Sequence, residues 1–500
     1  MTSTVAPWPA DSVIYELNTG AWLHDVSERA GVATTLANVP AAEWDQVTPR
    51  GIDAVWLMGV WERSPAGVQL ALESSEQVAS FHAALPDLED ADVLGSAYCI
   101  RRYEVDQRFG GRRGLAAARA ALAERGVRLM VDFVPNHVAP DHPWLTHHPD
   151  YFVRGSAEDL ATDPAGFLAV GDAVIARGRD PYFPPWPDVA QLNAFAPGLR
   201  QAAAETLRDI ADQADGVRCD MAMLLLNEVF ARTWGGRAGT VPEQEYWTEV
   251  IGSVRTAHPD FVFAAEAYWD MEWNLQQLGF DYCYDKRLYD RLIHDGPDAI
   301  RGHLHADVDY QRRLLRFLEN HDEPRAATEF APAKERAAAV VIATLPGATM
   351  WHEGQFAGWR VRLPVFLGRR PVEPVDHELQ RFHNDLISGT ATLRRGDWQL
   401  CGTSGWPEDA SHSQILTWSW TDETQRSLIV INFADAPAAA RVHPRWDDLA
   451  ERMWRLDDVL SGHVFVRDGT EIATNGLYVQ LAPWAFHIFA LRDERSAGAA

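Results

Sequence analysis

Short apolar segments with the character of β-strands alternate with helix-like segments over the first three quarters of this 500-residue chain. Eight strand candidates lie at residues 13–17, 52–58, 127–134, 216–220, 261–267, 280–285, 316–320 and 348–353. Helical patterns separate several of them, at 113–126, 197–215 and 333–345. Eight strands with intervening helices predict a (β/α)8 TIM barrel, a fold that takes about 250 residues and more when it carries insertions.

Two regions depart from this alternation. Residues of about 138–192, after the third strand candidate, are rich in proline, aspartate and aromatic residues and have little helical periodicity, which predicts a small inserted subdomain. After about residue 395 the pattern changes to short strand-like runs such as 413–421 and 427–434, which predict a C-terminal antiparallel β-sandwich domain. The expected domains are therefore a catalytic barrel over 1–395, with its insertion, and a sandwich over 396–500.

Composition and charge exclude several classes of partner. The formal net charge is −26 and the isoelectric point is near 5.0, so the field of the protein would repel nucleic acids and anionic membrane surfaces. The four cysteines are scattered along the chain without a CxxC pair, which favours reduced thiols over a zinc ribbon.

The sequence gives no indication of export or of membrane insertion. The opening residues, MTSTVAPWPADS, lack both a basic start and an apolar core, so no secretory signal is expected. The longest apolar run, 337–345, stops at Pro346 and is too short to span a bilayer. We therefore expect a cytoplasmic protein, and its oligomeric state stays open.

Acidic residues stand at the predicted C-terminal ends of three strands, where barrels of this kind carry their reactive groups. Asp220 ends the fourth strand, Glu266 lies in the fifth and Asp322 follows the seventh. Arg218 precedes Asp220 by two residues, and side chains two apart on a strand point to the same side. The sequence thus predicts three carboxylates around one barrel mouth, with Arg218 orienting Asp220.

Such a group of carboxylates suits glycoside hydrolysis. Like charges at close range and burial both raise carboxyl pKa values, so one of the three groups is expected to keep its proton near neutral pH. Glycosidases need one carboxylic acid to protonate the leaving oxygen and one carboxylate to attack carbon or to activate water.

Four segments at these strand ends resemble the signature regions of the α-amylase family, glycoside hydrolase family 13. They are DFVPNH (132–137), GVRCDMAML (216–224), FAAEAYW (263–269) and FLENHD (317–322), and they occur in the family's order. The resemblance covers essentially the whole chain, including the insertion and the C-terminal sandwich. It implies a retaining mechanism, in which a covalent glycosyl-enzyme forms and is then hydrolysed.

The resemblance also implies a role for each matched residue. Asp220 would be the nucleophile, Glu266 the general acid/base, and Asp322 the third carboxylate, which holds hydroxyls of the distorted sugar. The residues that would bind the substrate around that sugar are Tyr98, stacked under the ring, with His137, Arg218 and His321. Arg102 stands where the family usually has an acidic residue, which is a departure from the pattern.

Two further departures bear on the substrate and on metals. Many amylases have Lys and His at the third and fourth positions after the nucleophile, where these residues hold sugars on the leaving-group side; here Met223 and Leu224 occupy them. Many amylases also bind calcium between the asparagine of the first region and an acidic subdomain. Asn136 is present, but acidic ligands in the insertion cannot be assigned, so we predict no obligatory metal and no cofactor.

Other motifs have simpler interpretations. The run HVAPDHPWLTHHPD (137–150) offers metal-ligand residue types without a recognised spacing, so loop histidines are favoured. RFGGRRG (108–114) lacks the glycine spacing of a phosphate loop and is interpreted as a turn into a helix. Arg360, Arg362, Arg369 and Arg370 follow the eighth strand candidate; ion pairing within an acidic protein is favoured over recognition of an anionic substrate.

These observations predict a retaining α-glycosidase that acts on short α-glucosides or maltooligosaccharides, a small-molecule carbohydrate class. A transglycosylase, phosphorylase or isomerase would use the same site, because these reactions differ only in the acceptor that reaches the covalent intermediate. A catalytically silent carbohydrate-binding protein on the same fold is the second alternative.

Overall fold

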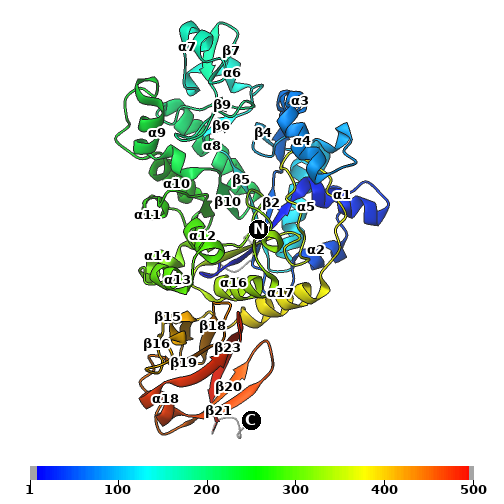
Figure 1. Cartoon of the computed structure of the whole chain (residues 1–500). Helices are drawn as coiled ribbons and strands as arrows, with labels where there is room; N and C mark the ends of the chain where they lie inside the picture. Colours follow the sequence, from blue (N-terminus) through cyan, green and yellow to red (C-terminus); the bar gives the residue numbers. More distant parts are fainter. Residues whose placement is uncertain (1–7, 495–500) are drawn as a thin grey trace. The chain divides into compact units, whose positions relative to one another are not determined.

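The computed structural model describes residues 8–494, and eight of its strands form a closed barrel (Figure 1). The ring order is β1-β14-β13-β12-β11-β10-β5-β2. The strands are β1 (Val13–Asn18), β2 (Ala54–Met58), β5 (Arg128–Phe133), β10 (Gly216–Cys219), β11 (Val262–Ala265), β12 (Tyr282–Tyr284), β13 (Leu314–Arg316) and β14 (Ala348–His352). Neighbouring strands pair in parallel, for example β10 with β5 and with β11. The predicted (β/α)8 barrel is confirmed.

The chain divides into two compact units. The first contains the described chain up to Thr48 together with Ile52–Tyr284 and Val361–Val372. The second contains Pro49–Gly51, Asp285–Arg360 and the described chain from Glu373 onward. Each unit is described by itself below.

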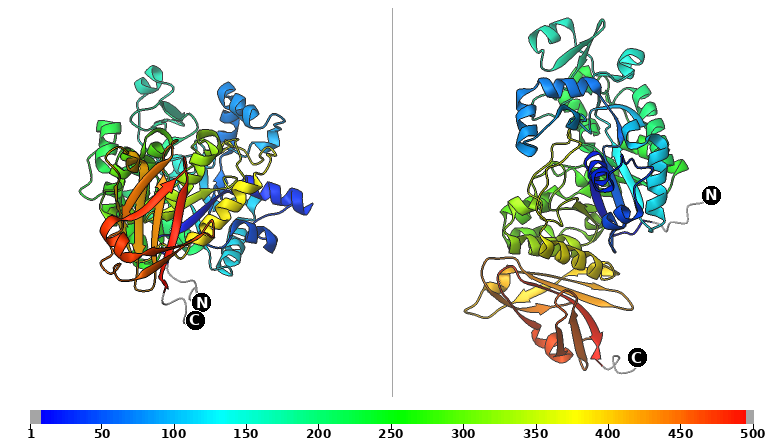
Figure 2. Two further views of the ribbon diagram at one scale, coloured as in Figure 1. Left: turned by 60° about the horizontal axis from the view of Figure 1, so that its bottom comes forward. Right: turned by 90° about the vertical axis from the view of Figure 1, so that its right-hand side faces the viewer.

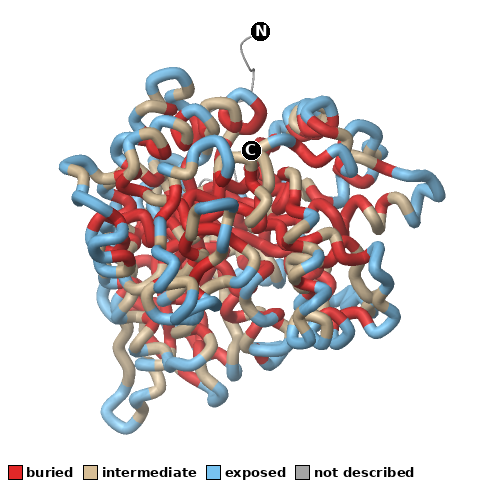
Figure 3. Tube along the Cα trace, turned by 90° about the horizontal axis from the view of Figure 1, so that it is seen from above, coloured by how far each residue is buried: buried red, intermediate tan, exposed pale blue. Residues whose placement is uncertain are grey.

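The first unit holds six of the barrel strands, and their side chains are almost all buried. Continuous burial is expected for parallel strands, because helices cover one face and the barrel interior covers the other. Its principal helices are α1 (Thr19–Ala30), α2 (Ala41–Val47), α5 (Gly111–Ala123), α8 (Pro197–Gln213), α9 (Asn227–Trp234), α10 (Tyr246–Ala257) and α11 (Glu272–Gln277). Figure 3 shows the buried stretches of the trace in red and the exposed stretches in pale blue.

The predicted insertion after the third barrel strand is present in the first unit. It contains the two-stranded pair β6 (His137–Val138) and β9 (Ala190–Gln191), the hairpin of β7 (Phe167–Val170) and β8 (Ala173–Ala176), and the short helices α6 (Trp144–His147) and α7 (Ala157–Thr162). Val138, Phe152, Ile175 and Leu192 are buried in its own apolar cluster. Figure 1 shows this subdomain in cyan, around the labels α6, α7 and β7.

A second excursion, between β2 and β5, was not predicted. It comprises β3 (Trp61–Arg63), which pairs with β4 (Ile100–Val105), and the helices α3 (Pro65–Glu73) and α4 (Ser75–Ala84). Ser64 and Ser74 cap the two helices, their hydroxyls accepting hydrogen bonds from the backbone N–H groups of Gly67 and Gln77. Serine before proline at a helix start is a signal that the sequence does contain.

The second unit contains β13, β14 and the sandwich. The sandwich sheets have the orders β15-β17-β18-β23-β20-β21 and β16-β19-β22. The strands are β15 (Asp397–Leu400), β16 (Gly402–Ser404), β17 (Ile415–Thr421), β18 (Arg426–Asn432), β19 (Ala438–His443), β20 (Met453–Asp458), β21 (Val464–Asp468), β22 (Leu477–Leu481) and β23 (Phe486–Asp493). Leu428 and Phe489 of the larger sheet and Val442 and Val479 of the smaller one belong to one buried cluster. The predicted β-sandwich is confirmed, and Figure 2 shows its strands in orange and red.

Helices of the second unit lie between β12 and the sandwich strands in the sequence. They are α12 (Lys286–His294), α13 (Pro297–His303), α14 (Val308–Arg312), α15 (Ala326–Glu329), α16 (Pro332–Thr344) and α17 (His377–Thr390), with α18 (Gly469–Asn475) inside the sandwich. The indole N–H groups of Trp418 and Trp420 on β17 both donate to the carbonyl oxygen of Thr344, at 3.1 and 2.8 Å. These bonds fix the sandwich to the end of α16.

The seventh barrel strand lies earlier than predicted, at Leu314–Arg316 and not at 316–320. The amide oxygen of Asn320 accepts hydrogen bonds from the backbone N–H groups of Asp322 (2.9 Å) and Glu323 (2.8 Å). This side-chain turn replaces strand pairing beyond Arg316, although Phe317 and Leu318 continue the apolar run. In the described part of the chain, no helix has the length and apolar character needed to cross a membrane.

Candidate active site

Arg218 is the centre of the candidate site. It lies on β10, level with Asp132 of β5 and Ala264 of β11, and its side chain is 1% exposed. Its Nη1 donates to Asp220 Oδ1 at 2.7 Å, and its Nη2 is 2.9 Å from Glu266 Oε2. One guanidinium therefore contacts two of the three predicted catalytic carboxyl groups.

The backbone between the two strand ends fixes the position of Glu266. Its N–H donates to the Cys219 carbonyl at 3.0 Å, and its own carbonyl accepts from Ala222 N at 3.1 Å. Met221 N donates to Glu266 Oε2 at 2.6 Å, and Met221 has a left-handed backbone with φ of 42°. The strained residue next to Asp220 thus turns its N–H toward the neighbouring carboxyl group.

Tyr268 is a residue of this site that the sequence analysis missed. Its hydroxyl donates to Glu266 Oε1 at 2.9 Å, so each oxygen of Glu266 has a donor of its own. The signal was the two-residue spacing in Glu-Ala-Tyr, which can place a hydroxyl beside a carboxyl group at a strand end.

The surroundings of Arg218 favour a permanent cation. Burial alone would lower its pKa, but Glu266 first, then Tyr98 and Tyr284, and Asp220 raise the pKa to well above the ordinary value for arginine. Its guanidinium carbon lies 5.1 Å from the ring centroid of Tyr98 and 5.4 Å from that of Trp56. A cation between the two carboxyl groups offsets part of the repulsion expected between like charges.

The first signature region lies at the entry to the insertion. His137 starts β6 and is buried, and burial lowers its pKa to about 4, so its imidazole is neutral near pH 7. The neighbouring Asn136 is also buried, and its amide oxygen accepts from Gln191 Nε2 at 2.9 Å. The pair of amides connects the residue before β6 with β9 inside the subdomain.

The remaining two predicted site residues lie in the second unit, where they contact each other. His321 is buried, and its Nε2 is 2.9 Å from Asp322 Oδ2. The segment that carries them is held at its base by a buried ion pair, in which Arg325 Nη1 donates to Glu319 Oε1 at 2.6 Å. Burial raises the pKa of Glu319 above its usual value.

The side chains that follow the nucleophile candidate offer no polar group. Met223 and Leu224 lie in the short 3-10 helix Ala222–Leu225 and are 0% and 3% exposed. Cys219 is fully buried, and burial raises the pKa of its thiol well above the usual range, as expected of an inert thiol.

Within residues 8–494, no group of three or more histidine, cysteine, aspartate or glutamate side chains is arranged to hold a metal ion. The surroundings of Asn136 do not fit calcium, because its amide oxygen accepts a hydrogen bond from the Gln191 side-chain NH2 group. Calcium needs carboxylate or carbonyl oxygens around it.

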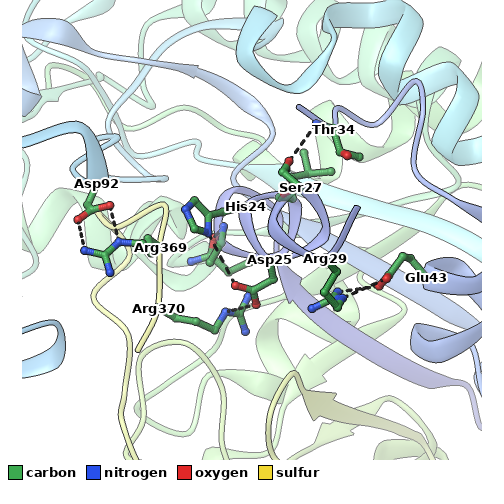
Figure 4. A network of polar contacts seen from close by, with 12 residues as sticks. His24, Asp25, Ser27, Arg29, Thr34, Glu43, Asp92, Arg369 and Arg370 are labelled. Carbon is green, nitrogen blue, oxygen red and sulfur yellow. Dashed lines mark hydrogen bonds and ion pairs between the residues drawn. The ribbon is translucent and has the colours of Figure 1, made fainter. Parts of the chain in front are cut away.

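Arg369 and Arg370 have acidic partners within the first unit (Figure 4). Arg369 donates hydrogen bonds to the Asp92 carboxylate through Nε (2.8 Å) and Nη2 (2.7 Å) and also forms an ion pair with Asp87. This hydrogen bonding lowers the pKa of Asp92. Arg370 Nε lies 3.1 Å from Asp25. For these two arginines the favoured interpretation, ion pairing within an acidic protein, agrees with the structure.

Comparison with known sequences finds α-amylases. No family model matches the chain. The α-amylase MalA of Haloarcula japonica is 24% identical over 454 residues, which is 86% of this chain. The chain spans 56% of the length of that relative.

Comparison with solved structures finds the same fold. The maltogenic α-amylase AmyB of Thermotoga neapolitana has a TM-score of 0.67 and 17% identity, with 96% of this chain and 98% of that chain covered. The α-amylase of Geobacillus thermoleovorans, solved in complex with acarbose, has a TM-score of 0.67 and 17% identity, with 98% and 100% covered. These likenesses extend over the barrel, the insertion and the sandwich.

Proposed function

We propose that this chain, α-amylase-like in sequence and in fold, is a retaining α-glycoside hydrolase that cleaves short α-glucosides or maltooligosaccharides through a covalent glycosyl-enzyme. The observation that carries the proposal is that Arg218 contacts both Asp220 and Glu266, which follow adjacent barrel strands, through two different nitrogen atoms. A nucleophile and an acid/base next to each other, with one cation between them, suit double displacement.

In the first step a carboxylate oxygen of Asp220 attacks the anomeric carbon while the bond from that carbon to the glycosidic oxygen breaks. Glu266 gives its proton to the departing oxygen. In the second step Glu266 takes a proton from water as the water oxygen attacks the same carbon, which releases Asp220 and the sugar with its original configuration.

The other matched residues bind the sugar in this proposal. Asp322 holds ring hydroxyls, with His321 beside it, and Tyr98 stacks under the ring. His137 acts as a neutral hydrogen-bonding partner, which its lowered pKa supports. Arg218 keeps Asp220 ionised and aimed.

Short substrates are favoured because the positions that hold the leaving-group side in many amylases carry buried apolar side chains, Met223 and Leu224. The proposal includes no cofactor and no obligatory metal. It also includes a cytoplasmic location and a domain boundary near residue 395.

A substrate panel tests the function. Maltose, trehalose, sucrose, glucosylglycerol, glucosylglycerate and maltooligosaccharides are each incubated with and without phosphate or a sugar acceptor, and the products are identified. Release of free sugar without an acceptor supports hydrolysis, and turnover only with an acceptor points to a transferase or phosphorylase.

Two variants separate catalysis from folding. Asp220→Asn should abolish turnover while its thermal unfolding stays close to that of the wild type. Asp447→Asn, at an exposed position of the sandwich, is the matched control and should keep full activity. Turnover by Asp220→Asn would contradict the assignment of the nucleophile.

A further inference from the structure

The loop formed by residues 319–326 of the second unit is closed by the side chain of its first residue. Glu319 is fully buried, and its Oε1 accepts a hydrogen bond from Arg325 Nη1 at 2.6 Å. Its Oε2 accepts a second one from the backbone N–H of Ala326, also at 2.6 Å. The loop lies beyond the end of β13 at Arg316, and the two bonds to Glu319 therefore hold its ends together.

Arg325 connects this loop to the end of the last barrel strand. Its side chain is 3% exposed, and its Nη1 also donates to the carbonyl oxygen of Glu353 at 2.7 Å. The same nitrogen lies 2.9 Å from Nδ1 of His352, the last residue of β14. A guanidinium nitrogen of this kind carries two hydrogens, so it can bond to Glu319 and Glu353 at once. Arg325 therefore fixes the loop relative to β14.

Asp322 is an accessible carboxylate inside a loop that is anchored on both sides of it. Its side chain is 48% exposed, whereas that of the adjacent His321 is 2% exposed. On the other side, Glu323 Oε1 lies 3.2 Å from Nζ of Lys286, the first residue of α12. The direction of the Asp322 carboxylate therefore depends on contacts that its neighbours in the loop make.

The ion pair of Arg325 with Glu319 is better explained by geometry than by stability. Burial raises the pKa of Glu319 above its usual value, against the opposing effects of Arg325 and of the Ala326 N–H group. Desolvation offsets much of the attraction in a buried pair, so such a pair contributes little net stability. A planar guanidinium bonded to fixed acceptors nevertheless allows few arrangements of the loop that carries it.

We propose that Arg325 and Glu319 are positioning residues for Asp322, and that their ion pair places the carboxylate that holds the hydroxyls of the distorted sugar. The inference rests on the proposed function and adds to it the two residues on which this contact depends. Neither residue touches the substrate, and both act through the loop between them.

A double-mutant cycle tests this role. Arg325→Lys should lower kcat on α-glucosyl fluoride about 10- to 100-fold with little change in KM, because displacing a group that acts on the distorted sugar by about 1 Å has an effect of this size. Lysine keeps the charge but cannot reproduce the planar contact. In the Asp322→Asn background the same change should have an effect of less than about twofold, because the contact that Arg325 sets is already lost.

A second variant and a local measurement cover the case in which Arg325→Lys misfolds. Glu319→Gln keeps the size of the side chain but removes the charge that Arg325 meets, and it should give the same non-additive pattern with Asp322→Asn. Amide hydrogen exchange of the peptide 319–326 should be faster in both variants than in the wild type, while exchange of β18 in the sandwich stays unchanged.

A matched control is a buried ion pair in the sandwich. Asp458 is 4% exposed, and its Oδ2 lies 2.6 Å from Nδ1 of His487. Asp458→Asn should lower the free energy of unfolding, because it removes one charge of a buried pair. It should leave kcat on the fluoride unchanged, both in the wild type and in the Asp322→Asn background.

Three outcomes overturn the positioning role. If the losses of Arg325→Lys and Asp322→Asn multiply in the double variant, Arg325 does not act through Asp322. Wild-type kcat in both Arg325→Lys and Glu319→Gln would show that the ion pair is not used. A wild-type protein that does not hydrolyse the fluoride would instead refute the proposed function before any variant is compared, and the positioning role with it.

Discussion

Replacing Arg218 by lysine removes one of the two contacts that join the candidate nucleophile to the candidate acid. The guanidinium reaches Asp220 at 2.7 Å and Glu266 at 2.9 Å through different nitrogen atoms, and lysine has only one nitrogen to offer. A hydrogen bond to a charged group contributes about 1.5–3 kcal/mol, so kcat/KM should fall about 10- to 100-fold. Because the lysine keeps a positive charge at this position, the free energy of unfolding should fall by less than in a variant that removes the charge.

Arg218→Met is a more severe change at the same position, because it leaves the two buried carboxyl groups of Asp220 and Glu266 without their cation. Breaking a buried pair in this way costs about 3–5 kcal/mol, so the urea midpoint of this variant should drop well below that of the lysine variant. Arg113, exposed on α5, gives the controls Arg113→Lys and Arg113→Met, which should change neither quantity. The assay is kcat/KM on α-glucosyl fluoride together with urea unfolding at the same pH. Wild-type activity and stability in Arg218→Met would refute the reasoning.

Three further predictions follow from single contacts. Tyr268→Phe removes the hydroxyl that donates to Glu266, and kcat should fall about tenfold with little change in KM, measured at steady state. His383 is fully buried, and burial lowers its pKa to about 4 in the folded protein. The unfolded chain therefore takes up a proton at this histidine at a higher pH than the folded protein does, and stability is lost as the pH falls from about 6.5 toward 4. The free energy of unfolding, measured in urea, should fall between pH 7 and pH 5 by about 2 kcal/mol less in His383→Phe than in the wild type. An equal fall in the two proteins would contradict this. Arg369→Ala should lower the unfolding free energy by about 1–3 kcal/mol through the loss of its pair with Asp92, while the ratio of rates on neutral and phosphorylated α-glucosides stays constant; a selective loss on the phosphorylated substrates would show that Arg369 reads an anion.

The barrel could be predicted from the sequence because its strands are buried on both faces and so form continuous apolar runs. All six residues of β5 are buried, and its predicted and observed bounds differ by one residue at each end. The end of β13 could not be placed, since the apolar run continues through Phe317 and Leu318 and only the Asn320 side chain marks the turn. The excursion through β3 and β4 was missed because β3 has three residues, two of them charged.

The candidate site was predictable where its contacts are local. The Arg218–Asp220 pair follows from a two-residue spacing on one strand. The Arg218–Glu266 contact joins two strands and depends on the register that sets Arg218 level with Ala264, which no single strand encodes.

The most direct test of this account is the identity of the residue that bonds to the sugar. The wild-type protein is treated with a mechanism-based α-glycosyl inhibitor, digested, and analysed by peptide mass spectrometry. The account predicts one covalent adduct, on the carboxyl group of Asp220, formed at a much lower rate in Glu266→Gln. An adduct on a different residue, or turnover with no adduct and inversion at the anomeric carbon, would contradict it.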